Sequence, residues 1–209
     1  GGPPFNPIEM DSKDWPQIIA KLQQDAALTA AFTAVYPSGW TGENITHAIA
    51  EYEKTLITPN SRFDKWLMGD KKALSANEVE GYNRFKAYRC ASCHVGKSIG
   101  GQSFEYMDLK KDYFADRGTP LGSDEGLKGF TKVATDLHKF KVPNLRNIEL
   151  TAPYLHDGTV TTLDESVRIM GVYLSGIDLP KGDRDLIVAF LRTLTGEYQG
   201  KPLQGTVAP

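Results

Sequence analysis

The sequence predicts an all-α protein whose helices are joined by long loops. Apolar residues repeat at helical spacing in several segments, residues typical of helix starts and stops flank those segments, and no convincing pair of alternating strands is present. Hydrophobic residues make up 40% of the 209 residues and charged residues 24%, as in ordinary globular proteins. A chain of this length can bury one sizeable core or two small ones.

Four helices are predicted in the first third of the chain, over residues 14–25, 25–36, 41–58 and 61–69. Asp14 is the predicted N-cap of the first helix, and Pro16 lies in its first turn, where the missing N–H costs little. The third helix places Ile45, Ile49 and Tyr52 on one face at helical spacing. The preceding segment GGPPFNPIEM has no features of a signal peptide and resembles a Gly/Pro-rich connection in the middle of a longer chain.

Three more helices are predicted around a loop-rich middle region, over residues 75–90, 162–171 and 183–196. Ser75 and Glu78 have the spacing of a capping box, and the second helix repeats this spacing at its start. Residues 95–143 are rich in Gly, Asp and Lys, so we expect a long loop region with one short helix at most.

The first and last of these three helices each carry one apolar face. We therefore expect them to cross in the core. Tyr82 and Phe85 of the first should pack against Phe190 and Leu191 of the last.

The charge pattern gives no sign of a nucleic-acid or membrane-surface partner. The formal net charge is −2, and no long run of one sign is present. No apolar run approaches the length of a membrane span. We expect neither a nucleic-acid partner nor a membrane span.

Both cysteines of the chain lie in the segment YRCASCHVG, as Cys90 and Cys93, with His94 directly after the second. A Cys-x-x-Cys pair alone fits a redox disulfide, half of a zinc site or a haem attachment. No second cysteine pair is present to complete a zinc site, and the βαβ setting of a redox dithiol is missing. Cys-x-x-Cys-His is the attachment motif of c-type haem, in which two thiols add to the haem vinyl groups and the imidazole binds the iron. Haem c is the predicted cofactor, and a bare dithiol beside a surface histidine is the alternative.

A haem that only carries electrons needs a second ligand opposite His94. The candidates are the four methionines and the other three histidines: Met10, Met68, Met107, Met170, His47, His138 and His156. Thioether ligation raises the haem potential and suits an electron carrier. Met170 ends a capped helix far downstream, where a chain wrapped around the haem could return, whereas core filling is the preferred reading of Met68 and Met107. His156, in PYLHDGTV, remains the rival.

Four segments carry a family resemblance over essentially the whole chain. They are GGPPFNPIEM, LITPNSRFDKWLMGDKKALSANEVEGYNRFKAYRCASCHVG, FKVPNLRNIELTAPYLHDGTVTTLDESVRIM and LIVAFLRTLTGEY. They resemble successive segments of the bacterial di-haem cytochrome c peroxidases. The stretch KVPNLRNIELTAPYLHDG is more specific to this family than the haem motif itself.

The resemblance implies a protein with two cytochrome c domains that reduces hydrogen peroxide to water. In this family the N-terminal, low-potential haem reduces the peroxide, and the C-terminal haem accepts electrons from a small donor, a c-type cytochrome or a copper protein. The motif from Cys90 to His94 matches that of the C-terminal haem, and Met170 matches its distal ligand. A related enzyme that oxidises a tryptophan cofactor precursor has Tyr at this position, so Met170 favours the peroxidase branch.

The resemblance also divides the chain into three parts. Residues 1–58 match the end of the peroxidatic domain, residues 59–196 match a cytochrome c-like electron-transfer domain with long loops wrapping a covalently attached haem, and residues 197–209 form a C-terminal tail. Attachment of haem c and the family both imply the bacterial periplasm. A homodimer is left open.

Three further positions carry roles implied by the resemblance. Glu9 matches the acid beside the peroxidatic haem, where a carboxylate could move a proton between the two peroxide oxygens. By itself, Glu9 would be read as a solvated acid near a chain end. Thr151 and Pro153 match backbone-carbonyl ligands of a calcium ion (Ca2+) between the domains, since carbonyl oxygens suit this hard cation. Without the resemblance they would be part of an extended loop shaped by proline.

One departure from the family keeps other functions open. The first Cys-x-x-Cys-His motif of the family and its surrounding sequence are absent, so this chain can attach one haem covalently. We expect it to be part of a longer protein. The alternatives are a stand-alone one-haem c-type cytochrome that only carries electrons and, less favoured, a haem-bearing module of a larger redox complex.

Overall fold

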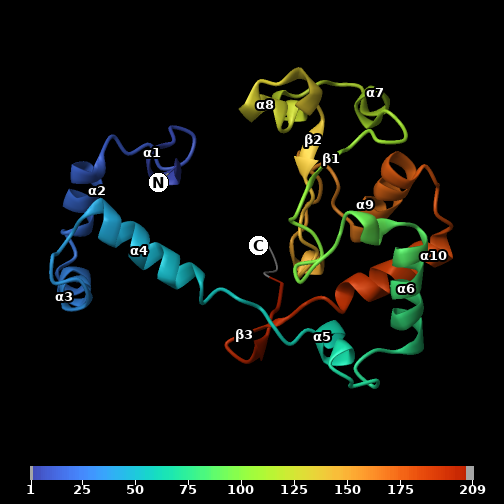
Figure 1. The fold of residues 1–209 in the computed structure, drawn as a ribbon, viewed down its shortest axis with the longest axis horizontal. Helices are drawn as coiled ribbons and strands as arrows, with labels where there is room; N and C mark the ends of the chain where they lie inside the picture. Colours follow the sequence, from blue (N-terminus) through green and yellow to red (C-terminus); the bar gives the residue numbers. More distant parts are fainter. Residues whose placement is uncertain (1, 206–209) are drawn as a thin grey trace. The chain divides into compact units, whose positions relative to one another are not determined.

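The structure is a computed structural model that describes residues 2–205 (Figure 1). The chain forms two compact units, which divide after residue 57. Most regular elements are helices, and the strands are only two or three residues long, so the predicted all-α class is confirmed. Within residues 2–205, no helix is both long enough and apolar enough to cross a lipid bilayer. The functions assigned above to the separate domains remain predictions.

The first unit holds four helices: α1 (Gly2–Phe5), α2 (Trp15–Leu22), α3 (Ala26–Val35) and α4 (Gly42–Glu53). Asp14 caps α2, as predicted, by accepting a hydrogen bond from the backbone N–H of Gln17 at 2.9 Å. The short helix α1 lies in the segment that we expected to be a connection, and its four residues are too few to show a helical period. The helix predicted over residues 41–58 ends earlier, at Glu53. After it, the backbone N–H groups of Thr55 and Leu56 each donate a hydrogen bond to the carbonyl three residues before them.

The apolar face predicted for α4 is only partly covered in this unit. Ile45 is buried, whereas Ile49, Tyr52 and Leu56 are 46%, 61% and 48% exposed. The unit is held instead by aromatic stacking, with the ring of Phe32 lying 3.8 Å from Trp40 and 4.6 Å from Tyr36 between ring centroids.

The second unit is built on α5 (Arg62–Leu67), α6 (Ala76–Ala87), α9 (Leu163–Met170) and α10 (Lys181–Arg192). Ser61 and Ser75 begin α5 and α6 with complete capping boxes, as predicted for Ser75. The helix predicted to end near Gly171 continues instead as a π-helical turn, Gly171–Ser175, and ends at Gly176, whose φ is 74°.

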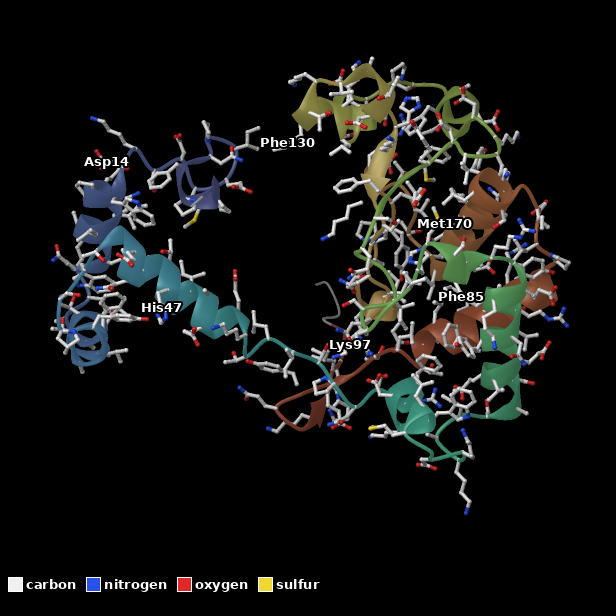
Figure 2. The ribbon with its side chains drawn as sticks, in the orientation of Figure 1. Asp14, His47, Phe85, Lys97, Phe130 and Met170 are labelled. Atoms are coloured by element: carbon white, nitrogen blue, oxygen red, sulfur yellow. The ribbon has the colours of Figure 1, made fainter. Side chains whose placement is uncertain are left out.

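The predicted crossing of the helix that precedes Cys90, α6, with the last helix, α10, is confirmed. Phe190 of α10 is fully buried, and its ring centroid lies 5.1 Å from that of Tyr82 and 5.4 Å from that of Phe85, both on α6. Gly81 allows this close approach, because a Cβ at that position would lie 1.9 Å from the carbonyl oxygen of Leu186. Figures 1 and 2 show α6 and α10 side by side, with Phe85 on α6.

The middle region, residues 95–143, has more regular structure than we predicted. It contains strands β1 (Phe104–Tyr106) and β2 (Lys139–Lys141), helices α7 (Tyr113–Arg117) and α8 (Lys128–Thr131), and the 3₁₀ turns η2 (Gly122–Glu125) and η3 (Ala134–Asp136). The two strands pair antiparallel, with Phe104 opposite Lys141. Elements of three to five residues are too short for alternation or helical periodicity to reveal.

The C-terminal residues of the second unit return to its beginning. Strands β3 (Glu197–Tyr198) and β4 (Lys201–Pro202) form a small hairpin where we predicted only a tail. The backbone N–H of Glu197 donates to the carbonyl of Pro59 at 2.8 Å. A Cβ on Gly196 would lie 2.1 Å from the carbonyl oxygen of Thr58, so the two segments are in direct backbone contact.

The second unit has two clusters of buried side chains. The first surrounds the crossing of α6 and α10 and includes Phe63, Leu145, Leu179 and Leu194. The second contains Met107, Tyr113, Phe114, Tyr154, Val160 and Ile169. Ile148, in the 3₁₀ turn η4 (Ile148–Leu150), and Leu163 pack against both clusters and join them.

Candidate haem site

The cysteine motif forms a tight turn directly after α6. Arg89 has a left-handed backbone with φ of 64°, which ends the helix and starts the 3₁₀ turn η1 (Cys90–Ser92). The backbone N–H groups of Cys93 and His94 both donate to the carbonyl of Cys90, at 3.3 and 3.0 Å. Both cysteines are free, and burial raises the pKa of the Cys90 thiol to about 11. Two free thiols and an imidazole are therefore held on one turn.

The imidazole of His94 is fixed from one side by backbone carbonyls. Its Nδ1 lies 3.3 Å from the carbonyl oxygen of Ile99, and the carbonyl of Pro143 is a second hydrogen-bond partner. Burial lowers the pKa of His94, so the ring is neutral at neutral pH. With the proton held on Nδ1 by the carbonyls, the lone pair is on Nε2, which is the arrangement of a metal-ligating histidine.

A cavity of about 290 Å³ lies beside this imidazole. Most of its lining side chains are aliphatic or aromatic, and the lining consists of Phe63, Leu67, Tyr82, Phe85, Ala91, His94, Val95, Gly96, Ile99 and Phe190. An apolar hollow, two free thiols and a neutral imidazole with an available nitrogen are what a covalently attached haem requires. The residues present therefore fit haem c.

Met170 lies at the end of α9 (Figure 2) and packs against the second cluster. The structure thus brings Cys90, Cys93 and His94 together but does not place Met170 among the residues that line the cavity beside His94. Ile148 and Leu163, which pack against both clusters, lie between the two parts.

The rival methionine ligands differ sharply in their surroundings. Met10 and Met68 are 65% and 73% exposed, which does not suit a ligand inside an apolar haem crevice. Met107 is buried in the same cluster against which Met170 packs, so burial does not separate these two.

The three rival histidines are each hydrogen bonded to a side chain in the described part of the chain. His47 bonds the phenol of Tyr36 at 2.8 Å. His138 bonds Asp108 at 2.6 Å, and the Nε2 atom of His156 bonds Asp124 at 2.8 Å. These bonds give each ring a structural role. For His156 they favour a histidine hydrogen bonded within a loop over a ligand of the haem iron.

The residues around His156 form a buried ionic network that the sequence reasoning missed. Arg117 bonds Asp124 and, at 2.8 Å, Asp157, and its side chain is only 16% exposed. The guanidinium holds the pKa of Asp124 well below its usual range, and Thr159 and Arg117 lower that of Asp157 despite its burial. The network joins α7, η2 and the loop before α9. No spacing rule links residues so far apart in sequence. The only part of this network that the sequence singled out was HDG, in the segment PYLHDGTV.

The remaining predicted site residues lie on exposed loops. Glu9 is exposed, in a turn where its backbone N–H bonds the carbonyl of Asn6. Thr151 and Pro153 are also exposed, and within residues 2–205 neither backbone carbonyl accepts a hydrogen bond. No group of three His, Cys, Asp or Glu side chains within residues 2–205 could bind a metal. A calcium ion at Thr151 and Pro153 would therefore depend on carbonyl oxygens.

Comparison with known proteins gives consistent matches. Residues 1–72 match the family model described as di-haem cytochrome c peroxidase. The cytochrome c peroxidase of Escherichia coli K12 is 54% identical over 198 residues, which cover 95% of this chain and 42% of that protein. The cytochrome c551 peroxidase of Nitrosomonas europaea is 43% identical over 199 residues, covering 94% and 57%.

Among solved structures, a MauG-like protein associated with microbial copper homeostasis is similar, with a TM-score of 0.77 and 28% identity. The match covers 91% of this chain and 65% of that one. The chain spans about half the length of the curated relatives named here.

Proposed function

Because this chain belongs to the di-haem cytochrome c peroxidase family, we propose that it serves the reduction of hydrogen peroxide to water with electrons from a small donor. Its own part is to receive those electrons at the haem c held by Cys90, Cys93 and His94. The observation that supports this most directly is the neutral imidazole of His94, which lines an apolar cavity on the same turn as two free thiols.

Four side chains hold the haem in this proposal. The thiols of Cys90 and Cys93 would attach the haem covalently, and His94 and Met170 would bind its iron. Bound in this way, haem c supplies a one-electron carrier, and the thioether of Met170 favours its reduced form. Because His94 and Met170 would both bind this iron, the peroxide would be reduced at a second haem.

Two further roles follow from the family relationship. Glu9 acts at the second haem, where its carboxylate moves a proton between the peroxide oxygens. Its exposed position in the first unit leaves it free to meet such a partner. The carbonyls of Thr151 and Pro153 bind calcium, and the absence of competing hydrogen bonds to them within residues 2–205 supports this.

The setting of the protein is proposed on the same grounds. Covalent haem attachment and the peroxidase relatives favour the bacterial periplasm. The donor is a small c-type cytochrome or copper protein.

Replacement of Met170 tests the ligand assignment. The Met170→Ala protein should lose the far-red absorption band of thioether–iron ligation and have a lower potential, because a thioether stabilises the ferrous state. Met107→Ala is the matched control, since that residue is buried in the same cluster. If Met107→Ala loses the band while Met170→Ala keeps it, the assignment is wrong.

Stopped-flow mixing with hydrogen peroxide tests the two-centre proposal. The oxidised chain of 209 residues should accept electrons from a small c-type cytochrome or copper protein, and once reduced it should be nearly inert to peroxide. Rapid oxidation of its haem, at the rate of the complete gene product, would show that peroxide reacts at this haem.

A one-haem electron carrier is the second candidate, favoured by the single Cys-x-x-Cys-His motif in the sequence. A pyridine-haemochrome and iron assay on the complete gene product separates the two. Two or more haems support the peroxidase, whereas one haem without peroxide turnover supports the carrier.

A further inference from the structure

The turn that follows Met170 is tied to the segment that precedes the haem motif. Ser175 is the last residue of the π-helical turn, and its hydroxyl donates a hydrogen bond to the backbone carbonyl of Tyr88 at 2.9 Å. Tyr88 is the C-cap of α6 and lies two residues before Cys90. Carbonyls at the C-terminal end of a helix have no partner within the helix, so this one is available to a donor from another element. The bond therefore joins the segment of Met170 to the segment of Cys90.

The acceptor of this bond is held by both helices that cross in the core. The backbone N–H of Tyr88 donates to the carbonyl of Arg84 in α6 at 2.9 Å, and its phenol donates to the carboxylate of Asp183 in the first turn of α10. The side chain of Tyr88 also packs against the first cluster. An acceptor fixed in this way can anchor the residue that donates to it.

The donor is connected to Met170 without a break in the helix. Met170 ends α9 with helical backbone angles, φ of −58° and ψ of −40°, and the next five residues form the π-helical turn. Because consecutive helical residues do not rotate independently, a restraint on Ser175 also restrains Met170. Single π-helical turns of this kind occur frequently at functional sites.

The middle region of the chain holds another part of the turn. The carbonyl of Tyr173 accepts a hydrogen bond from the backbone N–H of Lys110 at 2.8 Å, and its phenol donates to Asp116 at 3.0 Å. Its ring makes an edge-to-face contact with Tyr113, a member of the second cluster, at 5.1 Å between centroids. These contacts attach the turn to the second cluster, whereas the hydroxyl of Ser175 attaches it to the helix that leads into the haem motif.

We propose that Ser175 is a positioning residue for Met170 and that it acts through its hydrogen bond to Tyr88. The bond keeps the end of α9 in a fixed position relative to the turn that holds Cys90 and His94, so the thioether of Met170 is held at the iron. This role rests on the proposed function, in which Met170 binds that iron. Ser175 acts through the helix and not by contact with the haem.

A hydrogen bond at this place could instead contribute to the stability of the fold alone. Its loss would then lower the free energy of unfolding without changing how firmly Met170 is held at the iron. Displacement of Met170 by an added ligand separates the two roles, because it depends on the position of the thioether in the folded protein.

Imidazole titration of the oxidised, haem-loaded protein measures how firmly Met170 is held. Imidazole competes for the position of the thioether, and loss of the far-red absorption band reports the exchange. Ser175→Ala should bind imidazole about threefold to tenfold more tightly than the unmodified protein, a range that corresponds to the loss of one hydrogen bond. Unchanged imidazole affinity in Ser175→Ala would overturn the proposal, whatever the effect on unfolding.

A pair of variants with the same shape and one control make the test specific. Ser175→Thr keeps the hydroxyl and should stay within about twofold of the unmodified protein, whereas Ser175→Val lacks it and should behave like Ser175→Ala. Equal imidazole affinities in this pair would also overturn the proposal, and the pair covers the case in which Ser175→Ala folds poorly. Thr131→Ala is the control, since the hydroxyl of Thr131 bonds Leu127 at 3.3 Å and Asp136 at 2.8 Å, outside α9 and its turn. It should change the imidazole affinity less than about twofold.

Met170→Ala separates failure of the positioning role from failure of the proposed ligand. If Met170→Ala keeps the far-red band, Met170 does not bind the iron, and both the ligand assignment and the role of Ser175 are wrong. If Met170→Ala loses the band while Ser175→Ala binds imidazole as the unmodified protein does, the role of Ser175 is rejected and the peroxidase proposal stands. Tighter imidazole binding by Ser175→Ala, in a protein that has one haem and no peroxide turnover, would keep the role of Ser175 and reject the peroxidase.

Discussion

Truncation of Phe190 to alanine should be among the most destabilising single changes in the second unit. Phe190 has no exposed surface, and its ring lies 5.1 Å from those of Phe63 and Tyr82 and 5.4 Å from that of Phe85, between centroids. Removal of a buried phenylalanine costs about 3–5 kcal/mol through lost transfer free energy and the cavity left behind. That range already includes lost ring contacts, and because Phe190 loses three aromatic pairs we expect a value in its upper half, about 4–5 kcal/mol.

Denaturant unfolding of the haem-loaded protein measures this loss. The haem absorbance reports the second unit alone, because the attachment motif lies there. The slope of the free energy of unfolding against denaturant should stay unchanged while the midpoint falls. Phe130→Ala is the control, since that ring is 87% exposed and should cost less than about 0.5 kcal/mol. A loss below about 1 kcal/mol for Phe190→Ala, or equal losses in the two variants, would refute the assigned core.

Two other substitutions test the helix crossing and the ionic network. Gly81→Ala should lower the free energy of unfolding by about 1–3 kcal/mol, because its Cβ would collide with the carbonyl of Leu186. Gly182→Ala in α10 is the control, since its Cβ would meet no atom within 4 Å, and it should be neutral or stabilising. An equal loss in both variants would rule out the close approach of α6 and α10. The hydrogen bond from Arg117 lowers the pKa of Asp124 in the folded state. The ionised Asp124 therefore stabilises the fold above about pH 4, and this contribution is lost as the pH falls further. Asp124→Asn should lose about 3–5 kcal/mol at pH 7 and show a flatter decline of Tm between pH 5 and pH 2; an unchanged acid profile would contradict the network.

Features of the fold could be predicted from the sequence where they depend on neighbouring residues or on a strong helical periodicity. The capping boxes and N-caps of Asp14 and Ser75 depend on residues three apart, and the structure forms them as predicted. The crossing of α6 and α10 followed from two apolar faces, and the buried ring of Phe190 confirms it. The turn that holds Cys90 and His94 is encoded in five consecutive residues.

The features that the sequence did not predict depend on contacts between distant residues. The pairing of β1 with β2 joins three-residue strands separated by two helices, so neither strand shows a period of its own. The ionic network needs Arg117, Asp124 and Asp157 to meet in space, and no local pattern announces such a meeting. The π-helical turn after Met170 begins at Gly171, which lies so close to Leu179 that a Cβ would be 2.0 Å from that side chain, a contact that no local pattern predicts.

The contact between the two ends of the second unit has a consequence for how such proteins can be assembled from parts. Thr58 and Pro59 meet Gly196 and Glu197 through their backbones, so the segment that enters this unit and the segment that leaves it lie together. A domain with adjacent ends can be inserted, duplicated or fused at either side without disturbing its interior. A gene segment that encodes residues 58–197 is therefore a self-contained module that recombination could move between larger redox proteins as one piece.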